Sequence, residues 1–227
     1  MKKLVLFFLI LININFKAQE IDKTFYMLGA ISEYPHRIYN ERNPYNSGFI
    51  VNFHQKFYEK EITRLEEIIG IKFITAPKVE KCGNCHEFKN LVSKDLEKEI
   101  NQYYNIPENI NSKKSFSPNQ NIEKVLDSNK NQQESYLLGS FLMYGNIDKQ
   151  SKNYTISVAN NYNKFEILKK ILINLNNKIV KTEILKNIPK IYKIEFKPNK
   201  KLRNLFEIEM KNQTNKEDYL NKRFNKL

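Results

Sequence analysis

The stretch SYLLGSFLMY, residues 135–144, resembles an earlier stretch of the same chain, FYMLGAISEY at residues 25–34. Both contain a tyrosine, a leucine–glycine pair and a final tyrosine in the same order, and Gly139 lies 110 residues after Gly29. Similarity at a fixed offset is the signature of an internal repeat. We therefore interpret the chain as two diverged copies of one structural unit.

The segments after these two stretches also match in order. Short apolar runs typical of strands and apolar residues at helical spacing alternate in both halves. The matched pairs are GFIVNF (48–53) with YTISVA (154–159), IKFIT (71–75) with KIVKTEIL (178–185), and FKNLV (88–92) with LRNLF (202–206). Amphipathic helices are predicted at 54–70 and 166–175. The predicted fold class is α/β, or mixed α+β, made of two strand-strand-helix-strand units.

A polar stretch separates the two halves. It is rich in Asn, Ser, Lys and Gln and contains Pro107 and Pro118, a composition typical of a linker or a long surface loop. At most a short helix around Ile122 to Leu126 is expected inside it. The predicted organisation is a signal peptide (1–19), an N-terminal half (20–104), the linker or loop (105–134) and a C-terminal half with a basic helical tail (135–227).

The N-terminus has the pattern of a secretory signal. Lys2 and Lys3 precede an apolar run from Leu4 to Ile12, and Ala18 marks a plausible cleavage point. The run is shorter than the roughly 18 residues of a spanning helix. We expect an exported protein, periplasmic or extracellular, without a transmembrane segment after cleavage.

The net charge of +13 reflects lysines spread along the whole chain. No arginine-rich block or aromatic RNA-binding motif accompanies them. The charge predicts non-specific attraction to anionic surfaces. It does not predict a specific nucleic-acid partner.

Both cysteines of the chain lie in EKCGNCHEF, residues 80–88. Three kinds of chemistry use such a segment. CxxCH attaches haem c, which would involve Cys82, Cys85 and the axial ligand His86. A CGxC at the start of a helix is redox-active, because a helix N-terminus stabilises a thiolate. A third alternative is a quiet structural disulfide, or a zinc site completed by His86.

The segment CGNCHEFKNLVSKDLEKEI resembles the redox segment of thioredoxin-fold domains, above all those of thiol:disulfide interchange proteins. The similarity covers residues 71–100, and the positions that fall on the pattern are Cys82, Cys85, Phe88, Val92 and Asp95. It implies that Cys82 attacks, that Cys85 resolves the mixed disulfide, and that Lys81 and the X-Pro turn at Pro189 assist.

The primary prediction is an exported thiol–disulfide oxidoreductase that acts on protein thiols and disulfides. It needs no cofactor and no metal. The alternatives are a non-enzymatic secreted binding protein with a structural CxxC, and a c-type haem protein. A thioredoxin-like protein also requires a helix that begins near Cys85 or His86, and this requirement is the one a structure tests most directly.

Overall fold

The structure is a computed structural model of the 227-residue chain. It describes residues 20–31, 51–54, 66, 74–75, 88–92, 99–100, 102–105, 119–148, 150–186, 188 and 190–213. These residues form a mixed α/β fold, as predicted. Its helices are α2 (Lys23–Ala30), α5 (Ile122–Leu126), α6 (Lys130–Tyr144), α7 (Tyr162–Asn174) and α8 (Lys200–Gln213). Its strands are β1 (Val51–His54), β2 (Ile74–Thr75), β3 (Phe88–Val92), β4 (Gly145–Ile147), β5 (Tyr154–Ala159), β6 (Lys178–Leu185) and β7 (Ile191–Lys197).

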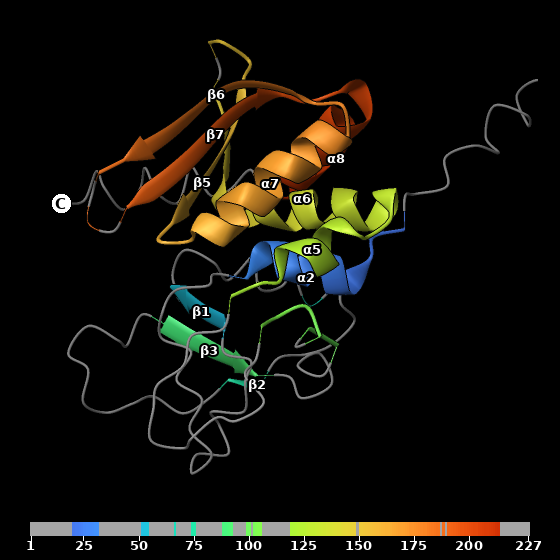
Figure 1. Ribbon diagram of the computed structural model, residues 1–227, viewed down its shortest axis with the longest axis vertical. Coiled ribbons are helices and arrows are strands. Elements are labelled where there is room, and N and C mark those ends of the chain that lie inside the picture. The colour runs from blue at the N-terminus through green and yellow to red at the C-terminus, as the bar shows by residue number, and fades with distance from the viewer. Residues whose placement is uncertain are drawn as a thin grey trace, which may run out of the picture.

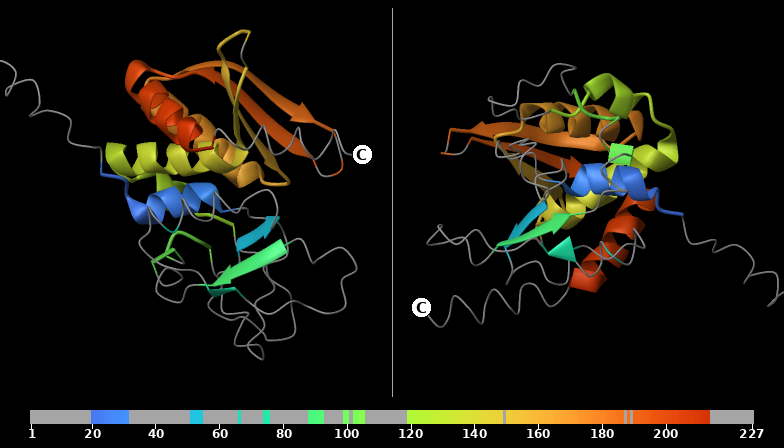
Figure 2. Two further views of the ribbon diagram at one scale, coloured as in Figure 1. Left: turned by 180° about the vertical axis from the view of Figure 1, so that it is seen from behind. Right: turned by 90° about the horizontal axis from the view of Figure 1, so that it is seen from below.

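The strands form two antiparallel sheets. The smaller sheet has the order β1-β3-β2 and the larger one β4-β5-β7-β6. In Figures 1 and 2 they lie on opposite sides of the layer that contains α2 and α6. In each half the last strand, β3 or β7, lies between the two strands that precede it in the chain. This shared order supports the predicted repeat, which stays a prediction.

One face of the larger sheet packs against helices. Alternate residues along β5 and β7, namely Tyr154, Ile156, Val158, Ile194 and Phe196, are buried on it. Such alternation is expected for a sheet with one solvated face, because successive strand residues point to opposite sides. The ring of Phe206 from α8 stacks on that of Phe141 from α6, and it also contacts Tyr154 and Phe196. The sheet and the helices therefore share one apolar core.

Helix α7 follows β5 and precedes β6 in the chain, and it packs on this face of the sheet. Its apolar residues recur at helical spacing, and Phe165, Ile167, Leu168, Ile171 and Leu172 are buried. The side chain of Asn161 accepts a hydrogen bond from the backbone N–H of Lys164, which caps the first turn. The sequence-predicted helix at 166–175 is thus confirmed, with a start four residues earlier.

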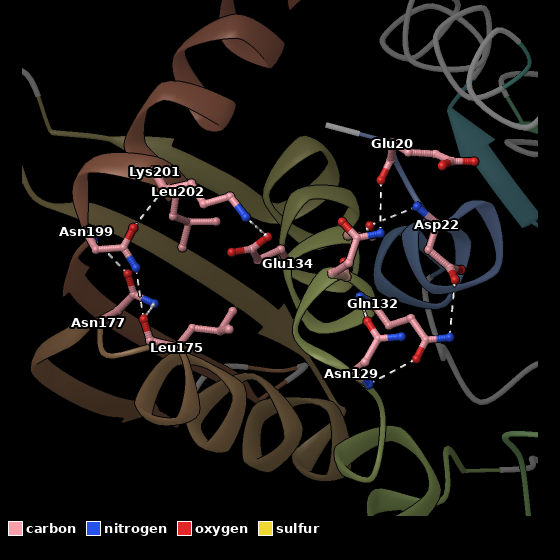
Figure 3. Close-up of polar contacts among 12 residues, drawn as sticks. Glu20, Asp22, Asn129, Gln132, Glu134, Leu175, Asn177, Asn199, Lys201 and Leu202 are labelled. Carbon is pink, nitrogen blue, oxygen red and sulfur yellow. Dashed lines mark hydrogen bonds and ion pairs between the residues drawn. The ribbon is translucent and has the colours of Figure 1, made fainter. Parts of the chain in front are cut away.

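Helices α2 and α6 run parallel and side by side. At their N-terminal ends, Gln132 donates a hydrogen bond to the carboxylate of Asp22 and the Asp22 backbone N–H donates to Ser135 (Figure 3). At their C-terminal ends, the Tyr144 hydroxyl donates to the carbonyl of Ala30. The two negative ends of the helix dipoles therefore lie together.

The crossing of α2 and α6 is built on two glycines. A Cβ at Gly29 would overlap the carbonyl oxygen of Tyr136, and a Cβ at Gly139 would overlap that of Tyr26. The contact is reciprocal, because each glycine faces the backbone three residues before the other. The leucine–glycine pairs that the sequence repeats are thus the points at which two backbones touch.

Several predicted elements are confirmed. The strands at 154–159 and 178–185 are β5 and β6, the strand at 48–53 overlaps β1, the strand at 71–75 contains β2, and the short helix near Ile122 is α5. Helix α6 starts at Lys130, inside the predicted linker or loop. Most of the helix predicted at 54–70 lies outside the described residues.

The prediction for the segment after the cysteines is wrong. The thioredoxin-like interpretation requires a helix that begins near Cys85 or His86 and continues through this segment, but Phe88–Val92 is the strand β3, paired with both β1 and β2. Apolar residues at positions 88, 91 and 92 fit one helical face, yet so short a run fits a strand as well, and the pairing of β3 on both sides decides between them. The match of FKNLV with LRNLF is also wrong, since residues 202–206 are helical in α8.

Candidate functional site

The residues that the sequence proposes as a redox site fall outside the described ranges. They are Lys81, Cys82, Cys85, His86 and Pro189. The structure does describe the segment immediately after them in the CxxC region, which is the strand β3. Because Phe88–Val92 is extended, it does not supply the helix whose N-terminus would stabilise a Cys82 thiolate. The thioredoxin-like character predicted around the CxxC is not supported.

The larger sheet presents a second, polar face, which we call the outer face. It is opposite to the face that packs on α6, α7 and α8, and the strand register groups its residues into rows across β5, β7 and β6. From the β6–β7 turn inward, the rows are Ala159, Ile191 and Leu185; then Ser157, Lys193 and Glu183; then Thr155, Glu195 and Lys181; then Lys197 and Lys178. Asn146 of β4 extends the third row.

Four lysines and two glutamates carry the charge of the outer face. Lys181 pairs with Glu183, and this hydrogen bond lowers the pKa of the Glu183 carboxyl and raises the pKa of the Lys181 ammonium. Lys193 lies 4.0 Å from the same carboxylate. The Glu195 carboxylate accepts a hydrogen bond of 2.5 Å from the Asn153 amide. Both acids are thus engaged within the chain, and the face has an excess of two positive charges.

The excess positive charge is concentrated at the end of the outer face that is farthest from the β6–β7 turn. Lys178 of β6 and Lys197 of β7 are Cα partners, so two like charges stand directly opposite each other on neighbouring strands. Both residues are exposed. Such a pair destabilises a sheet in isolation. An anion bound between the two ammonium groups removes that penalty, which makes this end of the face suited to an anionic partner.

A second polar cluster lies inside the molecule, at the C-terminal end of α2. The ammonium of Lys164, whose side chain is 1% exposed, donates to the carbonyls of Leu28 (3.1 Å) and Ile31 (2.8 Å). Gln120 also donates to Leu28, Ser140 donates to Gly29, and Tyr144 donates to Ala30. The carbonyls of Leu28 to Ile31, at the end of the helix and at its C-cap, have no partner within the helix, and other elements satisfy all four.

The charge of Lys164 also suits its position. A cation near a helix C-terminus is stabilised by the dipole, and here two parallel helices end together. The ammonium lies 5.5 Å from the centroid of the Tyr136 ring and 5.2 Å from that of the Tyr144 ring. This cluster anchors α2 to α6 and α7, so we assign it to the fold rather than to a ligand.

Metal chemistry and membrane spanning gain no support from the described part of the chain. It holds no group of three or more His, Cys, Asp or Glu side chains placed to bind a metal ion. Among its helices, none is both long enough and apolar enough to cross a membrane.

The architecture defines a class: two antiparallel sheets joined by a pair of parallel helices that cross at glycines. No protein-family model and no curated protein matches the chain. Solved structures of the endonuclease I-DmoI do match it. One, in complex with DNA and Ca, has a TM-score of 0.49 and 16% identity, covering 82% of this chain and 85% of that chain.

Two further structures of the same protein give similar values. A complex with DNA and Mn has a TM-score of 0.44 and 14% identity, covering 82% of this chain and 92% of that chain. A structure of mesophilic variants of the homing endonuclease has a TM-score of 0.47 and 16% identity, covering 81% and 86%. At these values the likeness carries no residue-by-residue argument for this chain.

The comparisons nevertheless correct the sequence-based interpretation. The matching structures are those of a DNA-bound endonuclease and not of a thioredoxin-fold protein, so the resemblance to thiol:disulfide interchange domains is wrong. The predicted thiol–disulfide exchange with protein substrates is wrong with it. The prediction of no specific nucleic-acid partner is contradicted as well, because two of the matching I-DmoI structures are complexes with DNA.

Sequence reasoning missed the lysines of the outer face, although a signal was present. In IYKIEFK, charged residues alternate with apolar ones at the period of a strand. That alternation places Lys193, Glu195 and Lys197 on one face of β7. In KIVKTEIL, Lys178 and Lys181 are three residues apart, and they share a face because the register of β6 shifts between them. Lysine is common throughout the chain, so the sequence alone does not show that these four lysines align on neighbouring strands.

Proposed function

We propose that this protein binds double-stranded DNA on the outer face of its larger sheet. The observation that carries the proposal is the alignment of Lys178, Lys181, Lys193 and Lys197 on two neighbouring strands, with Lys178 directly opposite Lys197. Phosphate contacts from lysine supply most of the affinity of a protein for duplex DNA. An anionic backbone also relieves the repulsion between the paired lysines.

The shape of the surface fits this partner. A two-stranded antiparallel ribbon is narrow enough to enter the major groove, which is about 12 Å wide. Strands β6 and β7 form such a ribbon, of eight and seven residues, at the edge of the sheet. Beside the lysines, the same face carries the short polar side chains of Ser157 and Thr155 on β5 and of Asn146 on β4, which are suited to hydrogen bonds with base edges. The predicted signal peptide would place this binding in the periplasm or outside the cell.

The test neutralises the four lysines of the outer face and compares the effect on DNA binding with that of neutralising four lysines elsewhere on the protein. The variant carries Lys178→Gln, Lys181→Gln, Lys193→Gln and Lys197→Gln. Binding to a fluorescent duplex is measured by anisotropy between about 50 and 200 mM salt. If all four lysines contact phosphates, the slope of log affinity against log salt becomes shallower by about 3.6, and affinity at physiological salt falls on the order of a hundredfold.

The matched control carries Lys23→Gln, Lys130→Gln, Lys170→Gln and Lys200→Gln, four exposed lysines on four different helices. It loses the same formal charge but leaves the outer face intact. We expect its salt slope to stay close to that of the unmodified chain. Equal losses of affinity in the two variants would refute the proposal, because they would mean that net charge alone drives binding. So would the absence of binding by the unmodified chain.

A further inference from the structure

The β6–β7 turn carries a group of apolar residues that the core does not use. Ile188 is 102% exposed, Ile184 is 56% exposed and Leu185 is 39% exposed. Strands β6 and β7 reach past the helices at one end of the larger sheet (Figure 1), and Ile188 lies between these two strands in the chain. A group of exposed apolar side chains beside one turn indicates a contact surface, because contiguous exposed apolar patches mark interaction sites.

The outer face becomes apolar toward this turn. Its row nearest the turn is apolar, with Ala159, Ile191 and Leu185, whereas the next rows carry the lysines. Lys186 and Lys190 are exposed on either side of Ile188. The apolar tip is thus continuous with the lysine-bearing face and has cations at its base, a combination that matches a partner with an anionic exterior and an apolar interior.

We propose that Ile188 is a wedge that inserts between two base pairs of bound DNA while Lys186 and Lys190 contact the flanking phosphates. This inference rests on the proposed function and names the element that deforms the duplex. Isoleucine is among the side chains that unstack a base step when they enter from the minor groove. Lys197 and Ile191 are six residues apart on β7, or about 20 Å. This separation is long enough for the tip to enter the minor groove next to the major groove that β6 and β7 occupy.

Pyrimidine–purine steps are the preferred target of such a wedge, since they unstack most easily. The partner is then recognised partly by its deformability. A duplex with a central TA step should be bound more tightly than one in which that step lies within a stiff A-tract. The preference should depend on Ile188 and not on the lysines of the outer face.

The experiment uses duplexes that carry 2-aminopurine at the central step, whose fluorescence rises when the base unstacks. With the full chain at saturation, we expect a several-fold rise on the TA duplex. Ile188→Ala should abolish the rise and the preference for TA while DNA remains bound at the lysine face. The matched control is Ile173→Ala, which removes an equally large isoleucine, 57% exposed, from α7. It should leave the rise unchanged.

The outcomes separate the two proposals. If the unmodified chain binds the duplex and the fluorescence does not rise, the wedge is refuted and DNA binding on the outer face stands. If no duplex is bound, both are refuted. A parallel experiment measures binding of the protein to vesicles of anionic phospholipid. Binding to vesicles that Ile188→Ala abolishes, together with unperturbed DNA, would make the turn a membrane contact and overturn the wedge.

Discussion

Replacing Gly29 or Gly139 with alanine is expected to destabilise the protein by about 3 kcal/mol or more. Each added methyl group would overlap a backbone carbonyl of the facing helix, at Tyr136 or Tyr26. Backbone cannot move aside as a flexible side chain can, so α2 and α6 must separate. Separation also strains the hydrogen bonds from Ser140 and Tyr144 to the end of α2. Chemical denaturation followed by circular dichroism measures the loss.

The sign of the effect makes this a sharp test. In an unconstrained helix, glycine to alanine stabilises by about 1 kcal/mol, because glycine loses more backbone entropy on folding. A stabilised Gly29→Ala variant would therefore contradict the close crossing. Lys23→Ala and Lys130→Ala, at exposed positions of the same two helices, serve as controls and should change stability little. The double glycine variant should lose less than the sum of the single losses, since one separation of the helices accommodates both methyl groups.

The sequence predicted the fold where local pattern and tertiary contacts agree. Strands β5 and β6 and helix α7 have clear alternation or helical spacing, and all three were predicted. For FKNLV the local pattern allows either a helix or a strand, and the position of β3 between β1 and β2 decides. The repeated leucine–glycine pairs were recognised as a repeat. Their role in the crossing could not be predicted, because it depends on which backbone faces each glycine.

The candidate site was harder to predict than the fold. CGNC attracted the functional interpretation because its spacing is chemically specific, whereas lysines are common and individually uninformative. Lys178 and Lys197 are 19 residues apart in the chain. They become a site only through the register of β6 and β7, and a one-residue slip would place them on opposite faces. Lys164 illustrates the same difficulty, since nothing in its local sequence distinguishes a buried lysine from a solvated one.

Lys164→Met is expected to destabilise the protein by about 2 kcal/mol. Methionine fills the space of the lysine stem but donates no hydrogen bond. The Leu28 carbonyl keeps Gln120 as a donor, whereas the Ile31 carbonyl loses the Lys164 bond that satisfies it in the structure. An unsatisfied buried acceptor and the uncompensated ends of two helix dipoles both oppose folding. The desolvation of a buried ammonium acts in the other direction, because the unfolded chain hydrates it fully. The carbonyls and the two tyrosine rings offset that cost in the folded state.

The net effect on stability is measured by comparing the midpoints of chemical denaturation of Lys164→Met and Lys169→Met. Lys169 lies on the same helix but is partly exposed and paired with Glu166, so its loss should cost well under 1 kcal/mol. If Lys164→Met proves as stable as the unmodified chain, desolvation outweighs the hydrogen bonds, and Lys164 does not anchor α2. If it is destabilised as expected, amide hydrogen exchange should rise first in the last turn of α2, where the Lys164 contacts lie, and later in the remote strand β5.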